Sequence, residues 1–502
     1  MFQDQIYISK LLGQLRRAGR STVLRYEDES LSGEALRARI FQYARVLRDL
    51  GIGRGTLLGL FAPNRPEAIA IRYAAHVLGA ATVYLSKPPT QVKRRAFVDR
   101  IAPDLMVLFP ETIGCLGQSV GVPFATVGID HVASEARLDA LATLASAEPF
   151  DVLANPNDLA VVASSGGSTG VPKGSCRSFV AYSEMVGIPS ASDRIQLING
   201  PLAYLSQVLL DVTLLGGGRV VLHDRFDPSD TLAAIERVRI TDLFLVEPQL
   251  FELMDHPELE AHDLSSLKSL THIGASAPKT LRLRARRRFG PIIGHLYGAS
   301  EMGVVSVLSP AEHDPSRPDR FTSAGRIKAG VEVRFRRTDG LLAKSGEPGL
   351  IEVRSAAVGD GYRNDPDLTS LNFQDGWYRS GDLGRLDRNG FLHILGRGID
   401  AQDIDGALVT PTDLEDALCR HPSIRYAAVV RDGSANVTIA AVCAWAGLSV
   451  DERECRKIVA AGFGDSIAAS LVLVMADHVP LTEQGKPDRA AIKQLACGLV
   501  AA

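Results

Sequence analysis

The feature that most constrains the fold is a regular alternation between short apolar runs and longer segments with helical periodicity. Leu57–Phe61 is an apolar run, and residues 66–78 after it repeat apolar residues with a helical period. Asp242–Val246 and residues 248–254 repeat this arrangement further along the chain. Such alternation is typical of βαβ units, and near-continuous apolar strands are buried on both faces of a parallel sheet. The first several hundred residues are therefore predicted to form βαβ units with a mostly parallel sheet.

The pattern changes after about Gly325, where short segments are separated by Gly, Asp and Asn residues. These residues favour hairpin turns over crossover helices, so antiparallel strands are predicted here. After Arg397 helix and strand patterns alternate again on a smaller scale, with a helix predicted over residues 412–420. We place a boundary near Asp400, between a large domain over residues 1–396 and a small α+β domain over residues 397–502.

Length, composition and charge exclude several classes of protein. At 502 residues the chain is long enough for several domains of about 150 residues each, so a single small binding module is excluded. Its 46% hydrophobic and 23% charged residues are ordinary for a globular protein. A net charge of -3 gives no electrostatic reason to expect nucleic acid or an anionic membrane as a partner.

The cysteines and the N-terminal residues predict a reduced, cytoplasmic location. The six cysteines are scattered, without a CxxC pair or a short His/Cys cluster, so neither a zinc site nor a disulfide framework is expected. The N-terminal residues lack the apolar core of a secretory signal. No apolar run approaches the roughly 20 residues that span a bilayer, so no membrane span is expected.

The strongest local signal is a segment rich in Gly and Ser after the apolar residues 159–163. It consists of Ser164, Ser165, Gly166, Gly167, Ser168, Thr169, Gly170, Val171, Pro172, Lys173 and Gly174. Glycines let the backbone turn around an anion, hydroxyl and amide groups donate to phosphate oxygens, and a lysine adds positive charge. The spacing differs from a Walker A loop, because Pro172 precedes Lys173 and Gly174 follows it. Composition alone supports a phosphate loop and an ordinary Gly/Ser surface loop equally.

Five further segments carry residue types suited to nucleotide chemistry. In chain order they are Ser276-Ala277-Pro278, Tyr297-Gly298-Ala299-Ser300-Glu301, residues 376–384 with Asp382, Gly396-Arg397 with Asp400, and residues 480–489 with Lys486. Taken singly, Tyr297 would be interpreted as a core residue and Lys486 as a solvated lysine. Together the six ordered segments resemble the signatures of the acyl-adenylate-forming superfamily, which includes acyl-CoA synthetases, adenylation domains of peptide synthetases and firefly luciferase. The resemblance covers residues 22–489.

The resemblance implies a nucleotide site assembled from these segments. The residues that would bind ATP are Ser164, Ser165, Gly166, Gly167, Ser168, Thr169, Gly170, Lys173, Ser276, Ala277, Pro278, Tyr297, Gly298, Asp382 and Arg397. Tyr297 would stack on adenine, and Asp382 would accept the ribose hydroxyls, roles that an aromatic face and a carboxylate fit. Ser300 would bond to the α-phosphate, and Glu301 would bind Mg²⁺, which prefers oxygen ligands.

The resemblance also implies a fold and a reaction. A large N-terminal domain of doubly wound sheets and a distorted β-barrel would carry a small, mobile C-terminal lid with its hinge at Asp400. Ser300, Glu301 and Lys486 would be catalytic, with Lys486 stabilising the charge that builds at the α-phosphorus as the acid's carboxylate attacks. Pyrophosphate would leave and an acyl-adenylate would form. The lid would then rotate, and a nucleophile would take the acyl group with release of AMP.

Three departures from the family pattern bear on the acceptor. Tyr204 stands where CoA-using members commonly carry histidine. After the hinge, Gly406 is present without the usual second glycine, and Asp403 stands where many members have lysine. Asp403 and Asp405 would not favour the negatively charged nucleotide of CoA. CoA remains the leading acceptor because it is the commonest in the superfamily. An amine and a separate carrier protein are alternatives, and a non-catalytic nucleotide- or acyl-binding relative is the rival class.

The pocket for the acid is predicted near Tyr204, Ala275 and Met302. A compact, aromatic or medium-sized acid is favoured over a very long lipid. The basic residues between Arg282 and Arg288 are predicted to form a solvated helix face without a function.

Overall fold

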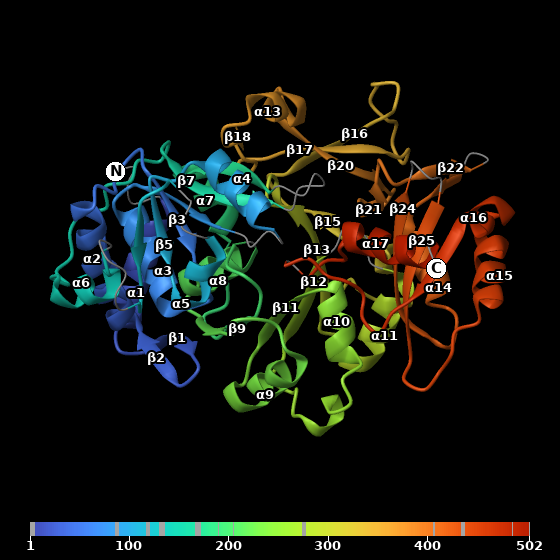
Figure 1. The fold of residues 1–502 in the computed structure, drawn as a ribbon, viewed down its shortest axis with the longest axis horizontal. Coiled ribbons are helices and arrows are strands. Elements are labelled where there is room, and N and C mark those ends of the chain that lie inside the picture. Colours follow the sequence, from blue (N-terminus) through green and yellow to red (C-terminus); the bar gives the residue numbers. More distant parts are fainter. Residues whose placement is uncertain are drawn as a thin grey trace.

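The computed structural model describes most of the chain, and Figure 1 shows the arrangement of its elements. The described residues are 6–85, 90–116, 121–129, 136–165, 172–188, 190–203, 205–273, 278–404, 407–432, 437–483 and 485–500. Two large, mostly parallel sheets come first along the chain, and a smaller antiparallel sheet follows. The C-terminal region, residues 397–502, lies beside α10 (Glu247–Met254) and α11 (Lys279–Phe289).

The first sheet contains the apolar run that the sequence singled out. Its strands, in spatial order, are β18 (Gly361–Tyr362), β8 (Lys173–Ser178), β7 (Leu159–Ser165), β4 (Ala81–Tyr84), β3 (Leu57–Phe61), β5 (Leu105–Leu108) and β6 (Phe124–Thr126). The strands from β7 to β6 are parallel, whereas β8 and β18 are antiparallel additions. β3 is buried at every position, as expected for a strand covered on both faces.

The second sheet contains β11, the other strand predicted from its apolar run. Its order is β15 (Arg326–Ile327), β14 (Gly303–Leu308), β13 (Ile293–Ala299), β12 (Ser269–Ile273), β11 (Asp242–Val246), β9 (Ile195–Ile198), β10 (Arg219–Leu222), β1 (Thr22–Tyr26) and β2 (Glu29–Ser32). The strands from β13 to β1 are parallel. The predicted doubly wound α/β class is confirmed.

Most of the helices in this part of the chain link successive strands, and local sequence sets where they begin. Besides α10 and α11, they are α1 (Tyr7–Ala18), α2 (Gly33–Asp49), α3 (Pro66–Val77), α4 (Gln91–Ile101), α5 (Pro110–Leu116), α6 (Leu138–Leu144), α7 (Phe179–Val186), α8 (Leu205–Leu215), α9 (Pro228–Val238), α12 (Pro318–Phe321), α13 (Pro366–Asn372) and the 3₁₀ turn Leu259–Ala261. The side chain of Ser32 caps α2 and that of Asp227 caps α9. Proline occupies the first turn of α3, α9 and α10, where its missing N–H has no helical partner to lose.

A buried polar network holds four of these helices together. Arg72 of α3 and Asp211 of α8 form a fully buried ion pair with an N–O distance of 2.7 Å. The hydroxyls of Tyr73 and Tyr182 donate to the Asp211 carboxylate at 2.5 and 2.6 Å. Tyr7 of α1 contacts the network through Arg72 at 3.4 Å. Because both charges are paired and hydrogen-bonded, their burial is tolerated, and α8 is fixed against α1, α3 and α7.

A curled antiparallel sheet follows, built from the segments in which the sequence predicted hairpins. Its strands are β16 (Glu332–Arg336), β17 (Gly349–Arg354), β20 (Trp377–Leu386) and β19 (Phe373–Gln374), with β21 (Leu392–Arg397) paired to β20. The buried carboxylate of Glu352 accepts hydrogen bonds from Arg334, Arg336 and Arg379, which tie β16, β17 and β20 together. This sheet corresponds to the distorted barrel expected from the resemblance.

The C-terminal region has its own small sheet and hydrophobic core. Its elements are β22 (Gln402–Ile404), β23 (Ala407–Val409), α14 (Pro411–Leu418), β24 (Ile424–Asp432), β25 (Val437–Ala444), α15 (Glu452–Phe463), α16 (Asp465–Ser470), β26 (Leu471–Met475) and α17 (Arg489–Val500). α14 begins one residue before the predicted helix and ends two residues earlier. One core face joins Leu418 and Val442 to Val459 and Leu471.

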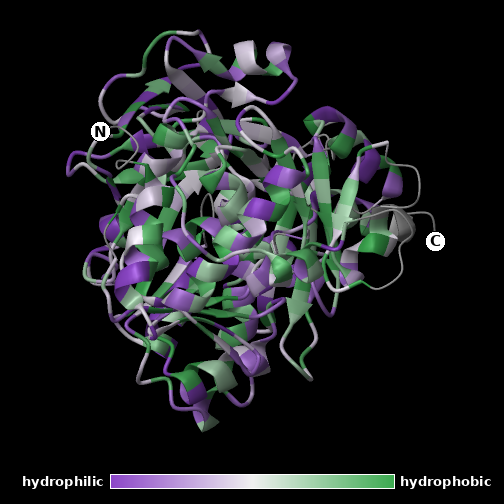
Figure 2. Cartoon of the chain, turned by 90° about the vertical axis from the view of Figure 1, so that its left-hand side faces the viewer, coloured by the Kyte–Doolittle hydropathy of each residue, from purple (hydrophilic) through white to green (hydrophobic). Residues whose placement is uncertain are grey.

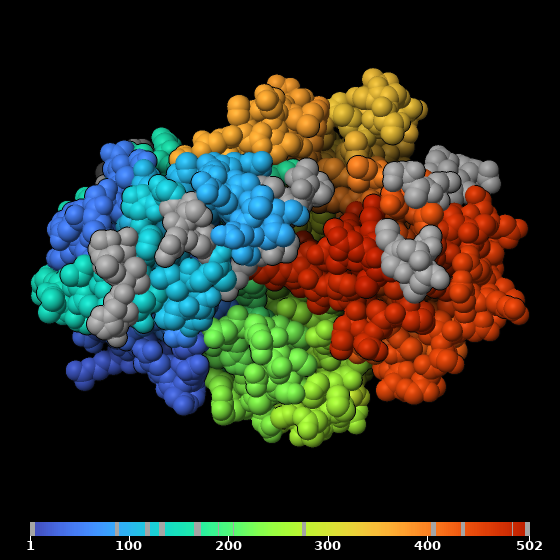
Figure 3. All heavy atoms as spheres, in the orientation of Figure 1, coloured from blue at the N-terminus to red at the C-terminus, as the bar shows by residue number. Residues whose placement is uncertain are grey.

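The opposite face of this small sheet packs against the second large sheet's helices. Phe251 of α10 and Tyr426 of β24 have ring centroids 4.4 Å apart, within a cluster that also contains Leu250 and Ile439. In Figure 3 the red and orange surface of the C-terminal region meets the green surface of the α10 segment. Figure 2 shows hydrophobic residues along the strands and more hydrophilic ones on the helices and loops around them. Among the described helices, none is long and apolar enough to cross a membrane.

Candidate active site

Tyr297, Asp382 and Arg397 meet although they come from three different strands. Tyr297 lies in β13 and is 2% exposed, and its hydroxyl donates to Asp382 Oδ2 at 2.7 Å. β20 and β21 place Asp382 directly opposite Arg397. Arg397 Nε lies 3.2 Å from Asp382 Oδ1, and its Nη1 donates to the carbonyl of Ser380 at 2.8 Å. The structure thus brings together three of the residues predicted to bind the nucleotide.

Asp382 keeps one carboxylate oxygen available. Oδ1 is close to Arg397 but receives no hydrogen bond, since the geometry of that contact is unsuitable for one. Burial raises the pKa of Asp382, whereas Arg397, the Tyr297 hydroxyl and Lys486 oppose this rise. Leaving a buried acceptor atom without a hydrogen bond is costly, so Oδ1 is suited to accept one from a ligand.

Glu301 is contacted on both oxygens by hydroxyl groups. Ser300 Oγ donates to Glu301 Oε2 at 3.0 Å, and the hydroxyl of Tyr362 donates to Oε1 at 3.2 Å. The Glu301 carbonyl accepts from the N–H of Gly359 at 2.8 Å, which fixes the backbone. The side chain is largely buried, at 6% exposure. A carboxylate held in one orientation is suited to binding a hard cation.

Gly298 allows the sharp change of direction between Tyr297 and Glu301. The pairing of β13 with β14 shifts register between Tyr297 and Gly298. A Cβ atom at Gly298 would lie 2.3 Å from the carbonyl oxygen of Gly303. Met302 is buried in the same cluster as Tyr297, on the core side of this turn. The close backbone approach therefore explains why glycine follows Tyr297.

Lys486 reaches the same place from the C-terminal region. Its loop is closed by hydrogen bonds from Thr482 N to the Lys486 carbonyl and from Gly485 N to the Thr482 carbonyl, both 2.8 Å long. Gly485 has a φ of 76°, and a Cβ there would lie 2.8 Å from Val246 Cγ2, at the start of α10. Only glycine combines this backbone conformation with this close contact.

The electrostatic surroundings of Lys486 connect it to the residues above. Lys486 is an exposed residue, but enough protein lies around its ammonium to desolvate it in part. This desolvation lowers the pKa of Lys486, and Arg397 lowers it further, whereas Asp382 and Glu301 raise it. The ammonium therefore lies within electrostatic range of both carboxylates and of Arg397.

Asp400 forms an ion pair that the sequence did not suggest. Its carboxylate contacts Arg489, the first residue of α17. Asp400 is 9% exposed, and its backbone N–H donates to the carbonyl of Arg397 in a tight turn. The turn joins β21, which carries Arg397, to the C-terminal region.

Several predicted residues have other partners or lie outside the described part. Ser164 Oγ donates to the carbonyl of Tyr84 at 3.0 Å, so this hydroxyl links β7 to β4. Lys173 begins β8, with Nζ 5.5 Å from the ring centre of Tyr362. Pro278 immediately precedes α11. The residues or side chains outside the described part are Ser165, Gly166, Gly167, Ser168, Thr169, Gly170, Tyr204, Ala275, Ser276, Ala277, Asp403, Asp405 and Gly406.

The prediction of a solvated basic face on α11 is wrong for part of the helix. Arg282 is buried, and its Nη1 donates to the carbonyls of Phe321 and Ser323. Arg284 donates to the carbonyl of Arg425 in the C-terminal region at 2.8 Å. The helix is covered on two sides by segments distant in sequence, which its own periodicity does not reveal.

Sequence reasoning missed Tyr362, Tyr378 and Arg489, which contact the predicted residues. A Gly-Tyr pair at 361–362 was the only local signal for Tyr362.

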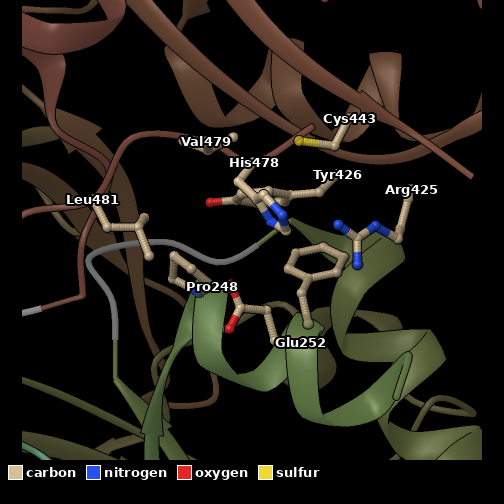
Figure 4. A pocket seen from close by; sticks show the side chains of 9 residues that line it. Pro248, Glu252, Arg425, Tyr426, Cys443, His478, Val479 and Leu481 are labelled. Atoms are coloured by element: carbon tan, nitrogen blue, oxygen red, sulfur yellow. The ribbon is translucent and has the colours of Figure 1, made fainter. Parts of the chain in front are cut away.

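The pocket in Figure 4 lies elsewhere, between α10 and the C-terminal strands, and is lined by Pro248, Glu252, Arg425, Tyr426, Cys443 and His478, among others. It is separate from the cluster around Tyr297 and Glu301.

Comparison with known proteins agrees with this geometry. The model of the family described as AMP-binding enzyme matches residues 13–363. A medium/long-chain-fatty-acid–CoA ligase, FadD8 of Mycobacterium tuberculosis, is 32% identical over 520 residues, covering 96% of this chain and 89% of the relative. An indoleacetate–CoA ligase of Aromatoleum aromaticum is 28% identical, covering 94% and 95%. The structure of the amide bond synthetase McbA from Marinactinospora thermotolerans matches with a TM-score of 0.86 at 29% identity, covering 97% and 99%.

These matches and the ordered site segments define the class of protein. The chain belongs to the family of AMP-binding enzymes, within the acyl-adenylate-forming superfamily that the sequence motifs indicated. Within that family it is an acid ligase of the AMP-forming type.

Proposed function

We propose that the chain activates a carboxylic acid with ATP and transfers the acyl group from the adenylate to a second substrate. The observation that supports this most directly is the convergence of Tyr297, Glu301, Asp382 and Lys486 from three segments far apart in the sequence. A binding protein would not need a lysine delivered to the nucleotide site from a separate C-terminal region.

Each of these residues would have a separate role in the first half-reaction, the formation of the acyl-adenylate. The buried ring of Tyr297 would lie against adenine, and Asp382 Oδ1 would accept a ribose hydroxyl. Arg397 and Lys486 would face the phosphates and the acid's carboxylate. The charge that develops at the α-phosphorus is stabilised more in the transition state than in the ground state by a lysine placed there. Burial and Arg397 lower the pKa of Lys486, whereas the nearby carboxylates of Asp382 and Glu301 favour its charged form.

Glu301 fits a Mg²⁺ ion that accompanies ATP. The described residues contain no cluster of three or more His, Cys, Asp or Glu that would hold a metal without a substrate. One carboxylate and a neighbouring hydroxyl, completed by phosphates and water, is a donor set that Mg²⁺ commonly takes. Bound there, the ion would offset the negative charge of the phosphates.

We further propose that residues 397–502 act as a lid that turns about Asp400. The contact of the Lys486 loop with Val246, together with the hydrogen bonds that close the loop, supports an orientation suited to adenylation. Rotation would withdraw Lys486 and expose the adenylate to the acceptor, as in other enzymes whose half-reactions use different closed states.

CoA is the proposed acceptor, and an amine is the second candidate. Two curated relatives that cover most of the chain are CoA ligases. The amide alternative is favoured by the McbA structure, which matches nearly the whole of both chains. Transfer to a separate carrier protein is a third route.

The test has two stages. Purified enzyme with MgATP and a panel of aliphatic and aromatic acids should exchange labelled pyrophosphate into ATP for at least one acid. The competent acid is then incubated with CoA or with a panel of amines, and products are weighed by mass spectrometry. A thioester supports the first choice, and an amide without thioester replaces it with the second. No exchange with any acid would contradict the proposal.

A further inference from the structure

Tyr362 contacts both Glu301, proposed to bind Mg²⁺, and Lys173, predicted to bind a phosphate. It belongs to β18, the short edge strand that pairs with β8, and lies opposite Ser175. Its backbone N–H donates to Thr369 Oγ1 of α13 at 2.9 Å. The side chain is 7% exposed. The backbone of Tyr362 is thus held by β8 and by α13.

The two ends of the Tyr362 side chain contact different predicted residues. The hydroxyl donates to Glu301 Oε1 at 3.2 Å. The ring lies 5.5 Å from Lys173 Nζ, within the range of a cation–π contact. Tyr378 of β20 is hydrogen-bonded to the Tyr362 hydroxyl. Burial, and next the nearby Glu301 carboxylate, raise the pKa of Tyr362, so the hydroxyl stays protonated and able to donate.

We infer that Tyr362 is a positioning residue that holds the carboxylate of Glu301 and the ammonium of Lys173 in fixed relation to each other. The inference rests on the proposed role of Glu301 in binding Mg²⁺. No motif used to predict the site includes Tyr362, and its partners are 61 positions away for Glu301 and farther for Lys173.

A held carboxylate should bind a cation more tightly than a free one. A glutamate side chain has several rotatable bonds, and ordering them opposes binding. Hydrogen bonds from Ser300 and Tyr362 fix both oxygens before the ion arrives. Removal of such a supporting hydrogen bond typically lowers metal affinity about 10- to 100-fold. The ring of Tyr362 likewise gives Lys173 a neighbour that is fixed in place by its own backbone contacts.

Two substitutions separate the two contacts. Tyr362→Phe keeps the ring near Lys173 but removes the hydroxyl from Glu301. Tyr362→Leu removes both. Tyr43→Phe removes a hydroxyl from a tyrosine of α2 that is 4% exposed and lies outside the site, and it serves as the control. Glu301→Gln tests the underlying assignment.

Binding of an ATP analogue that resists cleavage between its α- and β-phosphates is measured by calorimetry over a series of Mg²⁺ concentrations, and pyrophosphate exchange is followed alongside. Tyr362→Phe should need about 10-fold more Mg²⁺ for half-maximal binding of the analogue, with kcat near wild type at saturating Mg²⁺. Tyr362→Leu should in addition raise the KM for ATP. Tyr43→Phe should match wild type in both measurements.

The outcomes distinguish the inference from the proposed function. If Glu301→Gln shifts the Mg²⁺ dependence but Tyr362→Phe leaves it at the wild-type value, the positioning role of Tyr362 is wrong and the assignment of Glu301 stands. If neither variant shifts it, the proposed Mg²⁺ role of Glu301 fails and the inference with it. Thermal melting identifies a variant that has lost its fold, and Tyr362→Phe, which keeps the buried ring, then decides the question.

Discussion

Asp400 at the proposed hinge is ion-paired with Arg489, which lies only three positions after Lys486. The pair joins the proposed hinge to α17, the helix that follows the Lys486 loop. Asp400 is largely buried, whereas the Arg489 side chain is 51% exposed. Because Asp400 lies at the proposed hinge, we expect the contact to favour the proposed orientation for adenylation, with the modest strength of a partly solvated pair.

Replacing Arg489 by methionine should slow adenylation about twofold to fivefold, because a partly exposed ion pair contributes little free energy. Acyl transfer from a synthetic acyl-adenylate should be unchanged or faster. Pyrophosphate exchange and single-turnover transfer measure the two half-reactions. Arg420→Met, which breaks an exposed pair with Asp416 on the same region, is the matched control. Equal slowing of both half-reactions would contradict a role in lid orientation.

Lys486→Ala should reduce adenylation by about 100-fold or more, because it removes a cation that acts mainly in the transition state. Transfer from pre-formed acyl-adenylate should stay within a few-fold of wild type. Lys493→Ala removes another lysine of the C-terminal region, from α17, and should leave both rates unchanged. Pyrophosphate exchange at full activity in Lys486→Ala would remove the catalytic assignment.

Glu247 of α10 and Glu415 of α14 interact where the C-terminal region packs against α10. Their titration should make the stability of the fold depend on pH. Burial raises the pKa of Glu415 to about 7, although Arg489 and the N–H of Val429 oppose this rise. Burial and the Glu415 charge raise the pKa of Glu247, which Arg282 opposes. A proton held more tightly in the folded state stabilises it fully below the ordinary carboxyl pKa of 4.5, and this stability is lost as the pH rises towards 7.

Glu415→Gln should therefore flatten the pH dependence of stability between about pH 4.5 and pH 7. Urea unfolding at several pH values gives the free energies, and wild type minus variant isolates this group from other titrating residues. The difference should favour the variant increasingly as the pH rises. Glu452→Gln, at an exposed position of α15, should change the slope little. A difference that is constant with pH would show that Glu415 does not bind a proton in this range.

Asp211→Asn should destabilise the fold strongly, because it leaves Arg72 fully buried without its counter-charge. Breaking a buried pair from one side typically costs about 3–5 kcal/mol in the free energy of unfolding. Asp158→Asn, which breaks an exposed pair with Arg54, should have little effect. Urea denaturation of both variants makes the comparison. Similar losses for the two would mean that burial does not determine the contribution of the Arg72 pair.

Local patterns predicted the parts of this molecule that depend on local sequence. β3 matches the apolar run at Leu57–Phe61, and α3 follows it at Pro66–Val77. The β20–β21 hairpin follows from its turn residues. Ordered motifs identified Tyr297, Asp382 and Arg397, which the fold brings into contact.

Contacts between distant segments could not be predicted in this way. Asp400 and Arg489 are 89 positions apart, and Tyr362 and Glu301 are 61 apart. Neither pair follows from periodicity, because the strands and helices that carry them are brought together only by the tertiary fold. The burial of Arg282 was missed for the same reason, since its acceptors lie after the next strands.

The apolar packing of Phe251 against Tyr426 has a thermal consequence for the proposed lid movement. Turning the lid must separate these rings and uncover part of the hydrophobic cluster around them. Exposing apolar surface to water raises the heat capacity. Unless an equal apolar area is covered in the second orientation, the two orientations differ in heat capacity. The logarithm of the ratio of their populations then depends on inverse temperature along a curve rather than a straight line. The logarithm of the acyl-transfer rate should then bend when it is plotted against inverse temperature.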